Sequence, residues 1–413
     1  MTLDSDLALE LSKKYHTPLY VIEESVIRRQ CRKIKNALVY PNSVVRYACK
    51  ALSLISVLEI VREEGLWIDV VSYNEMLRAK RAGFRADQIL YTGEGGSPLV
   101  FERLIQEGVT INCSSLDHLR LLGRLRAGST CSVRINPGQG HGHGNKVNTG
   151  GPASKHGIYH DQIPDILEIA RECDLKISGV HAHIGSGTDL EEWLRISELT
   201  FSFAANFKDL QFIDLGGGFP VVYNPAVDKP MLLERWGREI SQKFTDFCKA
   251  YGRPLQLQIE PGRFCVAESG YLLAEVQAVK RTPDYNFVIV NSGLNHNPRP
   301  MMYGSYHPIE FVSLKPRVTD EMVEYVVGGY LCESGDVFTV SAEGVPQPRK
   351  FKPLDVGDLM IMGNAGAYCH SMKSEYNSMN LPAVVLVKED GSQKVIERRS
   401  NFDDLIKREV DCY

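Results

Sequence analysis

Two hydrophobic patterns alternate along the first two thirds of the chain. Short runs rich in β-branched residues favour strands, and between them apolar residues recur every three or four positions, as in amphipathic helices. Regular alternation of strand and helix predicts a parallel sheet. The strand pattern fits residues 44–50, 66–72, 87–93, 109–115, 131–138, 177–186, 211–218 and 255–262, and the helix pattern fits 72–83, 101–108, 159–173 and 231–252.

The number of these units predicts the fold class. About eight units in roughly 240 residues fit an α/β fold of the (β/α)8 TIM-like barrel type. An open Rossmann sheet is the structural alternative, but the early glycine fingerprint that it needs is missing. We therefore predict a cofactor-binding barrel over residues 29–270.

Beyond residue 270 the pattern changes to strands separated by turns. We predict a mostly β C-terminal domain over 271–413, which the strand within residues 1–28 joins. The basic, proline-containing stretch 347–358 is expected to be a solvated loop. Strands are predicted at 275–282, 286–293, 324–332, 336–344, 358–366 and 383–391.

Composition narrows the class of protein. The chain has 413 residues, of which 43% are hydrophobic and 24% charged, as in ordinary soluble enzymes. A net charge of −4 argues against a nucleic-acid-binding protein. No apolar run reaches membrane-spanning length, and the N-terminus lacks the apolar core of a signal peptide. The 10 cysteines form no CxxC pair, so we predict free thiols, no metal site and a cytoplasmic location.

Candidate chemistry lies at the ends of the predicted strands. Lys50 ends the first of them, at the edge where barrel enzymes place their active sites. On this stretch alone, a lysine that simply extends into water is the better explanation. Glycine clusters follow three later strands, at 183–187, 215–220 and 260–263. Glycine also marks ordinary turns, but two successive clusters near the seventh and eighth strands favour a phosphate site.

These residues together match the needs of pyridoxal 5′-phosphate (PLP). Its phosphate would approach the backbone of Gly216, Gly217 and Gly218, with the Ser186 hydroxyl as a further donor. Its aldehyde condenses with a lysine amine, which Lys50 supplies, and its ring nitrogen needs an acidic partner, which Glu260 supplies. A flat side chain packs on the ring, and His183 is suitably placed. Alone, His183 would more often be an ordinary core histidine.

Longer matches carry a family resemblance. The sequence resembles the alanine-racemase-like (fold type III) PLP-dependent decarboxylases, most closely the bacterial diaminopimelate decarboxylases. The resemblance covers nearly the whole chain. RINPG, NTGG, SKHGI and CESGD are highly specific, whereas HIGSG and EPGR also occur in ornithine and arginine decarboxylases. The matching stretches are YACKA, 134–159, HAHIGSG, GGGFP, EPGRF, RPMMYGSYH (299–307), CESGD (332–336) and GAY (366–368).

The resemblance implies a reaction and a role for each residue. The reaction is decarboxylation of meso-2,6-diaminopimelate to L-lysine and CO2. Lys50 binds the cofactor covalently, His183 stacks on its ring and Glu260 pairs with its nitrogen. Cys332 protonates the product carbanion from the second subunit of a homodimer. The other cofactor contacts implied are Ser186, Gly216, Gly217, Gly218, Gly262, Arg263 and Tyr368, and the substrate contacts are Arg263, Arg299, Tyr303, Glu333 and Tyr368.

The substrate contacts agree with the chemistry of diaminopimelate. Its distal end carries a carboxylate, which favours arginine, and an ammonium, which favours a carboxylate. The chain departs from the family pattern at Asn291, His296 and Asn364. These departures keep two alternatives open. One is a decarboxylase of another carboxylated amino acid or conjugate, as in siderophore or antibiotic assembly, and the other is a non-catalytic PLP-binding homologue. A racemase fits less well, because that branch has arginine at the ring nitrogen.

Overall fold

The computed structural model describes residues 3–139, 150–183, 185, 189–315 and 321–410. The chain forms two compact units. The first comprises Arg28–Val221 and Pro230–Cys265, and the second comprises Met1–Ile27, Val222–Lys229 and Val266–Tyr413. None of the helices in the described ranges is long and apolar enough to cross a membrane.

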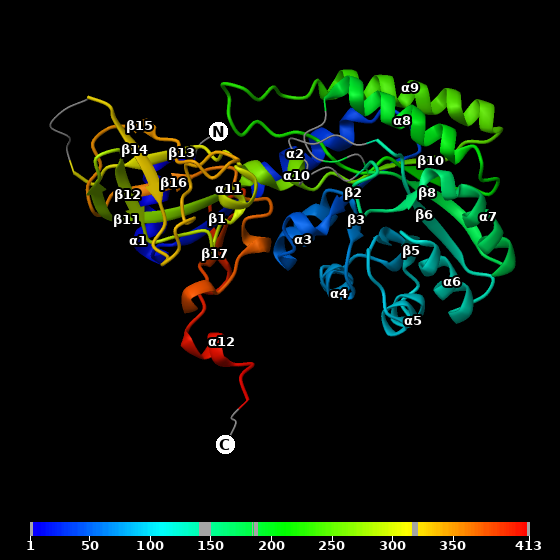
Figure 1. Ribbon diagram of the computed structural model, residues 1–413, viewed down its shortest axis with the longest axis horizontal. Coiled ribbons are helices and arrows are strands. Elements are labelled where there is room, and N and C mark those ends of the chain that lie inside the picture. Colours follow the sequence, from blue (N-terminus) through cyan, green and yellow to red (C-terminus); the bar gives the residue numbers. More distant parts are fainter. Residues whose placement is uncertain (1–2, 140–149, 184, 186–188, 316–320, 411–413) are drawn as a thin grey trace. The chain divides into compact units, whose positions relative to one another are not determined.

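The first unit is a closed parallel barrel, as predicted (Figure 1). Eight strands pair in the ring order β2-β3-β4-β5-β6-β8-β9-β10, and β10 returns to β2. Each coincides with one of the segments predicted from the sequence, and the short β7 (Ile158–Tyr159) extends β6. The barrel strands are β2 (Ser43–Ala48), β3 (Trp67–Val70), β4 (Ile89–Tyr91), β5 (Thr110–Cys113), β6 (Thr130–Asn136), β8 (Lys176–His181), β9 (Phe212–Asp214) and β10 (Gln256–Ile259).

Amphipathic helices cover the outside of the barrel (Figure 1). Three of them begin at a serine whose hydroxyl accepts a backbone N–H of the first turn: Ser72, Ser97 and Ser115. Their apolar stripes, such as Met76 and Ala79, are buried. The helices that follow β1 and the barrel strands are α2 (Glu24–Ala37), α3 (Ile55–Glu63), α4 (Tyr73–Arg81), α5 (Pro98–Gln106), α6 (Leu116–Leu125), α7 (Ile163–Glu172), α8 (Leu190–Ala204), α9 (Leu233–Tyr251) and α10 (Arg263–Val266).

The second unit is built on a mixed sheet of nine strands. Its main path is β15-β14-β12-β11-β1-β17-β18, and β16 joins β11 to β13. The N-terminal strand β1 therefore lies between β11 and β17, far from it in sequence. The strands are β1 (Leu19–Glu23), β11 (Gly270–Arg281), β12 (Asn286–Val290), β13 (Ile309–Val312), β14 (Val323–Gly328), β15 (Arg349–Phe351), β16 (Leu359–Met362), β17 (Ala383–Val387) and β18 (Gln393–Glu397).

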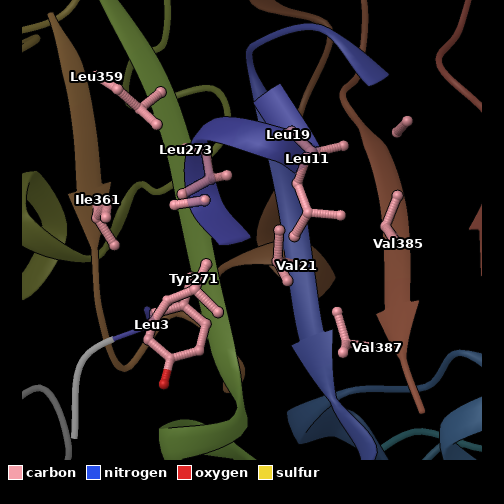
Figure 2. Close-up of a cluster of buried hydrophobic side chains, with 12 residues drawn as sticks. Leu3, Leu11, Leu19, Val21, Tyr271, Leu273, Leu359, Ile361, Val385 and Val387 are labelled. Atoms are coloured by element: carbon pink, nitrogen blue, oxygen red, sulfur yellow. The ribbon is translucent and has the colours of Figure 1, made fainter. Parts of the chain in front are cut away.

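One face of this sheet carries the hydrophobic core (Figure 2). Residues two apart on a strand share a face, so β1, β11 and β16 each contribute a pair, such as Leu19 and Val21, and β17 contributes three residues. Helix α1 (Ser5–Tyr15) covers this face with the buried Ala8 and Leu11. The other labelled core residues are Leu3, Tyr271, Leu273, Leu359, Ile361, Val385 and Val387.

Two predictions for this region are wrong. Residues 336–344 form no regular strand, because the Thr339 hydroxyl accepts the Val327 N–H at 2.9 Å and so replaces a backbone carbonyl in the pairing with β14. Only isolated bridges remain there. The predicted loop 347–358 contains β15, which pairs with β14, and the Arg349 guanidinium stacks 3.8 Å from the Tyr306 ring centroid. The arginine packs there instead of extending into water.

An ion-pair cluster beside β18 predicts how stability depends on pH. Glu397 contacts His370 at 2.6 Å and also contacts Lys373. Burial raises the pKa of Glu397, but His370 and Lys373 lower it to about 2 overall. A lowered pKa stabilises the fold above the ordinary glutamate pKa of about 4.3, and this contribution is lost as the pH falls towards 2.

Glu397→Gln should therefore lower the free energy of unfolding most above about pH 5. The difference from wild type should shrink steadily as the pH falls to about 2. Urea unfolding at several pH values measures this, and Glu310→Gln, an exposed glutamate on β13, is the control. A difference that is independent of pH would contradict the assignment.

Candidate active site

Four predicted cofactor residues follow neighbouring barrel strands. Lys50 follows β2, Glu260 follows β10, Gly216 follows β9 and His183 follows β8. These strands are adjacent in the ring, so their carboxyl ends meet at one barrel mouth. The Lys50 side chain is exposed, which also agrees with a lysine that simply extends into water. Its positive charge nevertheless lowers the pKa values of His183 and Glu260.

The glycine loop packs against His183. Gly216 has a φ of +69°, and a Cβ there would lie 2.7 Å from both the Ala182 carbonyl oxygen and His183 Nδ1. A Cβ on Gly217 would lie 2.4 Å from the Glu260 carbonyl oxygen. The Gly217 N–H donates to His183 Nδ1 at 2.9 Å, which fixes the orientation of the ring. Burial and the charge of Lys50 hold the pKa of His183 well below its usual range, so the imidazole is neutral.

This geometry limits how the loop binds a phosphate. The Gly216 N–H donates to Asp214 Oδ1, and the Gly217 N–H donates to His183. Among the described contacts, the N–H of Gly218, with a φ of +104°, is the one of the three that remains for an external anion. Ser186, predicted as a further phosphate donor, lies outside the described residues.

Gly262 is needed for close packing beside Lys50. A Cβ at this position would lie 3.0 Å from the Cβ of Ala48 and 3.1 Å from that of Ala51, the residues that flank the lysine turn. The Pro261 carbonyl accepts the Ala48 N–H at 3.3 Å. These contacts attach the EPGR segment to the end of β2. Arg263 then begins the short helix α10 and is half-buried.

Glu260 lies beside a histidine that the sequence analysis did not single out. His181 Nε2 lies 3.3 Å from Glu260 Oε2, and both side chains are buried. The Asn112 amide contacts His181 Nδ1 at 2.8 Å, and Ser132 donates to the amide oxygen of Asn112 at 3.0 Å. The amide nitrogen of Asn112 is therefore the donor, and the hydrogen of His181 sits on Nε2, facing Glu260. The sequence did contain a signal for His181: it precedes His183 by two residues, and residues two apart on a strand face the same side.

Electrostatics leaves Glu260 ionised among protonated neighbours. Burial raises the pKa of Glu260, but the His181 N–H and the charge of Lys50 lower it to about 2 overall. Burial and the charge of Glu260 raise the pKa of Asp69 to about 8 and that of Asp214 well above its usual range. One buried carboxylate is thus charged. Its Oε1 atom has no hydrogen-bond partner among the described residues.

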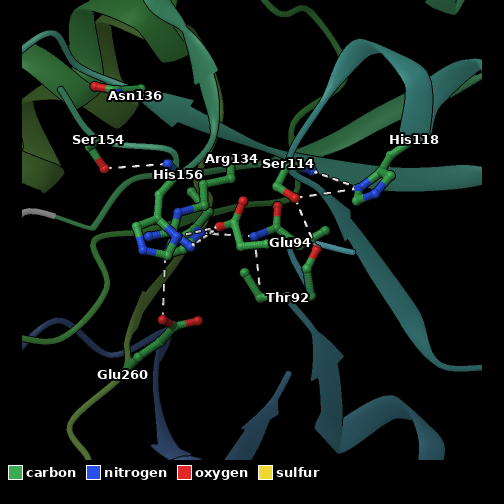
Figure 3. A network of polar contacts seen from close by, with 12 residues as sticks. Thr92, Glu94, Ser114, His118, Arg134, Asn136, Ser154, His156 and Glu260 are labelled. Atoms are coloured by element: carbon green, nitrogen blue, oxygen red, sulfur yellow. Dashed lines mark hydrogen bonds and ion pairs between the residues drawn. The ribbon is translucent and has the colours of Figure 1, made fainter. Parts of the chain in front are cut away.

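A second polar network lies at the same mouth (Figure 3). Glu94, which follows β4, accepts from Arg134 of β6 at 2.8 Å and contacts His156 Nδ1 at 2.6 Å. Burial raises the pKa of Glu94, but His156 and Arg134 lower it overall. Arg134 and His156 lie within the matched stretches RINPG and SKHGI. Sequence reasoning left them without a role because a polar contact across 40 or 62 residues has no local signal.

The barrel residues fit PLP. An ionised, buried carboxylate with an unpartnered oxygen suits a protonated ring nitrogen. A neutral, fixed imidazole suits ring packing, and a close-packed glycine loop suits a phosphate. The donor atoms of His181, Asp214 and Glu260 lie within 4.8 Å of one another, a spacing that a cation can also use. A ring N–H satisfies the same electrostatic need without a metal.

Of the predicted substrate residues, Arg263 lies in the first unit and the other four lie in the second. Arg299 begins helix α11 (Arg299–Tyr303) and is only 6% exposed. Its guanidinium contacts His307 Nε2 at 3.1 Å and Ser305 Oγ at 3.2 Å, and it stacks 5.0 Å from the Tyr223 ring centroid. No carboxylate of the described residues pairs with it. A buried arginine without an acidic partner is unusual and suits a bound anion.

The remaining predicted residues of the second unit are exposed or half-buried. Cys332 is exposed, and its N–H donates to Asn377 Oδ1 at 2.9 Å. Glu333 is also exposed and accepts from the Tyr376 hydroxyl at 3.2 Å. Tyr303 and Tyr368 are half-buried, and Tyr368 has a φ of +62°, which is rare for a residue with a side chain.

The three departures from the family pattern have structural roles. Asn291 accepts the Glu275 N–H at 2.8 Å and donates to Thr17 Oγ1 at 2.9 Å. Asn364 donates to the Val222 carbonyl at 2.9 Å. His296 is buried against Ser292, and burial lowers its pKa to about 3. Each side chain therefore bonds to other atoms of its own unit.

Comparison with known proteins agrees with this geometry. Residues 24–267 match the family model described as pyridoxal-dependent decarboxylase, pyridoxal binding domain. The chain is 37% identical to diaminopimelate decarboxylase of Escherichia coli (strain K12), with 98% of each chain covered. A crystal structure of diaminopimelate decarboxylase is 36% identical, with a TM-score of 0.93 and coverage of 100% of this chain and 98% of that one.

A third relative was solved with an amino acid bound. The Helicobacter pylori diaminopimelate decarboxylase complexed with L-lysine is 28% identical, with a TM-score of 0.85 and coverage of 97% of this chain and 98% of that one. The family model covers more than half of the chain, and the sequence relatives cover nearly all of it. The chain therefore belongs to the family of PLP-dependent decarboxylases.

Proposed function

We propose that the protein decarboxylates meso-2,6-diaminopimelate to L-lysine and CO2 with PLP as cofactor. The observation that carries the choice of substrate is Arg299, a buried guanidinium without a carboxylate partner among the described residues. A substrate with a second carboxylate supplies that partner, whereas ornithine and lysine, as substrates, present only an ammonium at the distal end. Full-length similarity to diaminopimelate decarboxylases supports the same substrate.

The barrel residues bind and orient the cofactor in this proposal. When bound, PLP supplies the electron sink that carbon–carboxylate cleavage requires. Lys50 would hold its aldehyde group, His183 would lie against its ring and Glu260 would hold the proton of the ring nitrogen. Gly218, Gly262 and Arg263 bind the phosphate, together with Ser186 and Tyr368. We propose residues 29–270 as the cofactor-binding domain and 271–413 with 1–28 as the β domain.

The second unit supplies most of the substrate contacts and a proton. Arg299 binds the distal carboxylate, and Arg263, Tyr303 and Tyr368 complete the substrate contacts. Glu333 binds the distal ammonium. The exposed Cys332 thiol donates a proton to the carbon that loses CO2, and it acts in the site of a second subunit of a homodimer. The amino-acid substrate and the free thiols suit an enzyme of the cytoplasm.

A CO2-release assay tests the substrate. The purified protein with PLP should decarboxylate meso-diaminopimelate with a kcat/KM at least about a hundredfold above those for L-lysine and L-ornithine, because a site built for a polar group rejects analogues that lack it. Equal release from the three amino acids would contradict the proposal. Release from none of them, with PLP bound, would indicate another carboxylated substrate or a non-catalytic homologue.

A further inference from the structure

A reversal of the chain brings three residues of the segment 299–307 together. Helix α11 ends at Gly304, which has a φ of +62° and lies so close to Ala342 that a Cβ would be 2.4 Å from its Cα. The chain turns back there, so that Ser305 and His307 contact the guanidinium of Arg299, the first residue of the helix. His307 is buried, with 1% of its surface exposed.

The two ring contacts of His307 select one protonation state. Nδ1 lies 3.0 Å from the Gly363 carbonyl oxygen, which can only accept, so Nδ1 carries a hydrogen. Nε2 lies 3.1 Å from Arg299 Nη1, which can only donate, so Nε2 carries a lone pair. Both bonds form together only when the ring is neutral with its hydrogen on Nδ1.

This arrangement leaves part of the arginine available. His307 and Ser305 accept from one N–H each on Nη1 and Nη2, and Tyr223 covers a face of the planar group. Of the five N–H groups of a guanidinium, two take part in these contacts, and the other three donate to no residue that the structure describes. A neutral acceptor on Nη1 fixes the guanidinium without neutralising its charge, which a carboxylate partner would do.

We infer that His307 is a positioning residue that sets specificity: in its neutral Nδ1–H form it orients Arg299 so that the guanidinium receives the second carboxylate of the substrate. The inference rests on the proposed role of Arg299. It adds that discrimination between ligands with and without this carboxylate depends on an acceptor at His307 Nε2. The hydrogen bond from His307 Nδ1 to the Gly363 carbonyl does not by itself maintain this discrimination.

Two substitutions separate the two ring contacts. His307→Asn keeps an amide near the position of Nδ1 and loses the acceptor for Arg299, whereas His307→Gln reaches the position of Nε2 and restores that acceptor. Ser305→Ala removes the other acceptor without disturbing the buried ring. His118→Asn removes a buried histidine on α6 that contacts Ser114 and so controls for general destabilisation.

The readout is the inhibition constant of L-lysine compared with that of cadaverine, which is lysine without its carboxylate. His307→Asn should raise the inhibition constant of lysine about tenfold, as expected for loss of a hydrogen bond to a charged group. The inhibition constant of cadaverine and kcat should stay nearly unchanged. His307→Gln should recover most of this loss. Ser305→Ala should shift the ratio of the two constants in the same direction, and His118→Asn should not shift it.

The outcomes distinguish this inference from the proposed function. If Arg299→Ala does not weaken lysine relative to cadaverine, the role of Arg299 is wrong. If Arg299→Ala does so while His307→Asn and Ser305→Ala weaken both ligands equally, the positioning role alone is overturned. Equal losses in His307→Asn and His307→Gln would also overturn it, since only the glutamine restores the acceptor.

Discussion

Lys50→Ala should lower CO2 release by roughly a thousandfold or more. The lysine amine is the proposed covalent anchor of the cofactor, and a single proton-transferring group by itself contributes roughly a hundred- to ten-thousandfold. Lys50 lies at the mouth of the barrel, and its charge acts on His183 and Glu260. Borohydride reduction of the wild-type protein should fix PLP on the peptide that contains Lys50, and the variant should show no fixed label.

Two control variants make this result specific. Lys50→Arg keeps a positive charge but lacks a condensing amine, so it should be as inactive as the alanine variant. Lys80→Ala removes an exposed lysine that pairs with Glu107 on the barrel surface and should keep wild-type activity. Label on another lysine, or turnover in Lys50→Arg, would show that Lys50 is not the anchor.

The same inactive variant tests the proposed sharing of sites in a dimer. Cys332→Ala should also be inactive if the thiol is the proton donor. Mixed with Lys50→Ala, it should regain part of the activity, because one site of a hybrid dimer then has both residues. No recovery after verified subunit exchange would count against a shared site.

Arg299→Ala should raise KM for diaminopimelate by about a hundredfold or more. The variant leaves a substrate carboxylate without its charged partner, which costs roughly 2–5 kcal/mol of binding. The structure strengthens the expectation, because the guanidinium is 6% exposed, held by His307 and Ser305, and unpaired with any described carboxylate. Turnover of lysine as a substrate should start low and change little.

Arg299→Lys is the matched control. It keeps the charge but loses the planar fork that contacts His307, Ser305 and a carboxylate together, so its KM should lie between wild type and alanine. Circular dichroism should show that both variants fold. If KM rises equally for diaminopimelate and for lysine, Arg299 supports the fold and does not read the distal carboxylate.

The barrel was predictable from sequence, and the candidate cofactor residues could be proposed from it, because both signals are local. A strand followed by a helix leaves a pattern within about 30 residues, and repetition of that pattern specifies a closed parallel sheet. Lys50 and Glu260 then had to meet, because carboxyl ends of neighbouring parallel strands share one edge. Glycine clusters at those ends marked where the backbone approaches closely.

The strand predicted at 336–344 failed because its competitor is not local. The Thr339 hydroxyl accepts the N–H of Val327, a residue of β14 that lies 12 positions away, and so replaces a backbone carbonyl in the pairing with that strand. β-propensity measures only what a segment prefers by itself. The preference lost to a side-chain hydrogen bond that exists only once the unit has folded.

Sequence alone therefore determined the candidate residues for the chemistry: a lysine, a glutamate, a histidine and a glycine loop at strand ends, and an arginine in the segment 299–307. The tertiary structure decided what each one touches. His181 meets Glu260 across 79 positions, and Gly304 turns His307 back onto Arg299. Periodicity records only which way a side chain faces, whereas protonation state and orientation depend on partners that folding brings from distant segments.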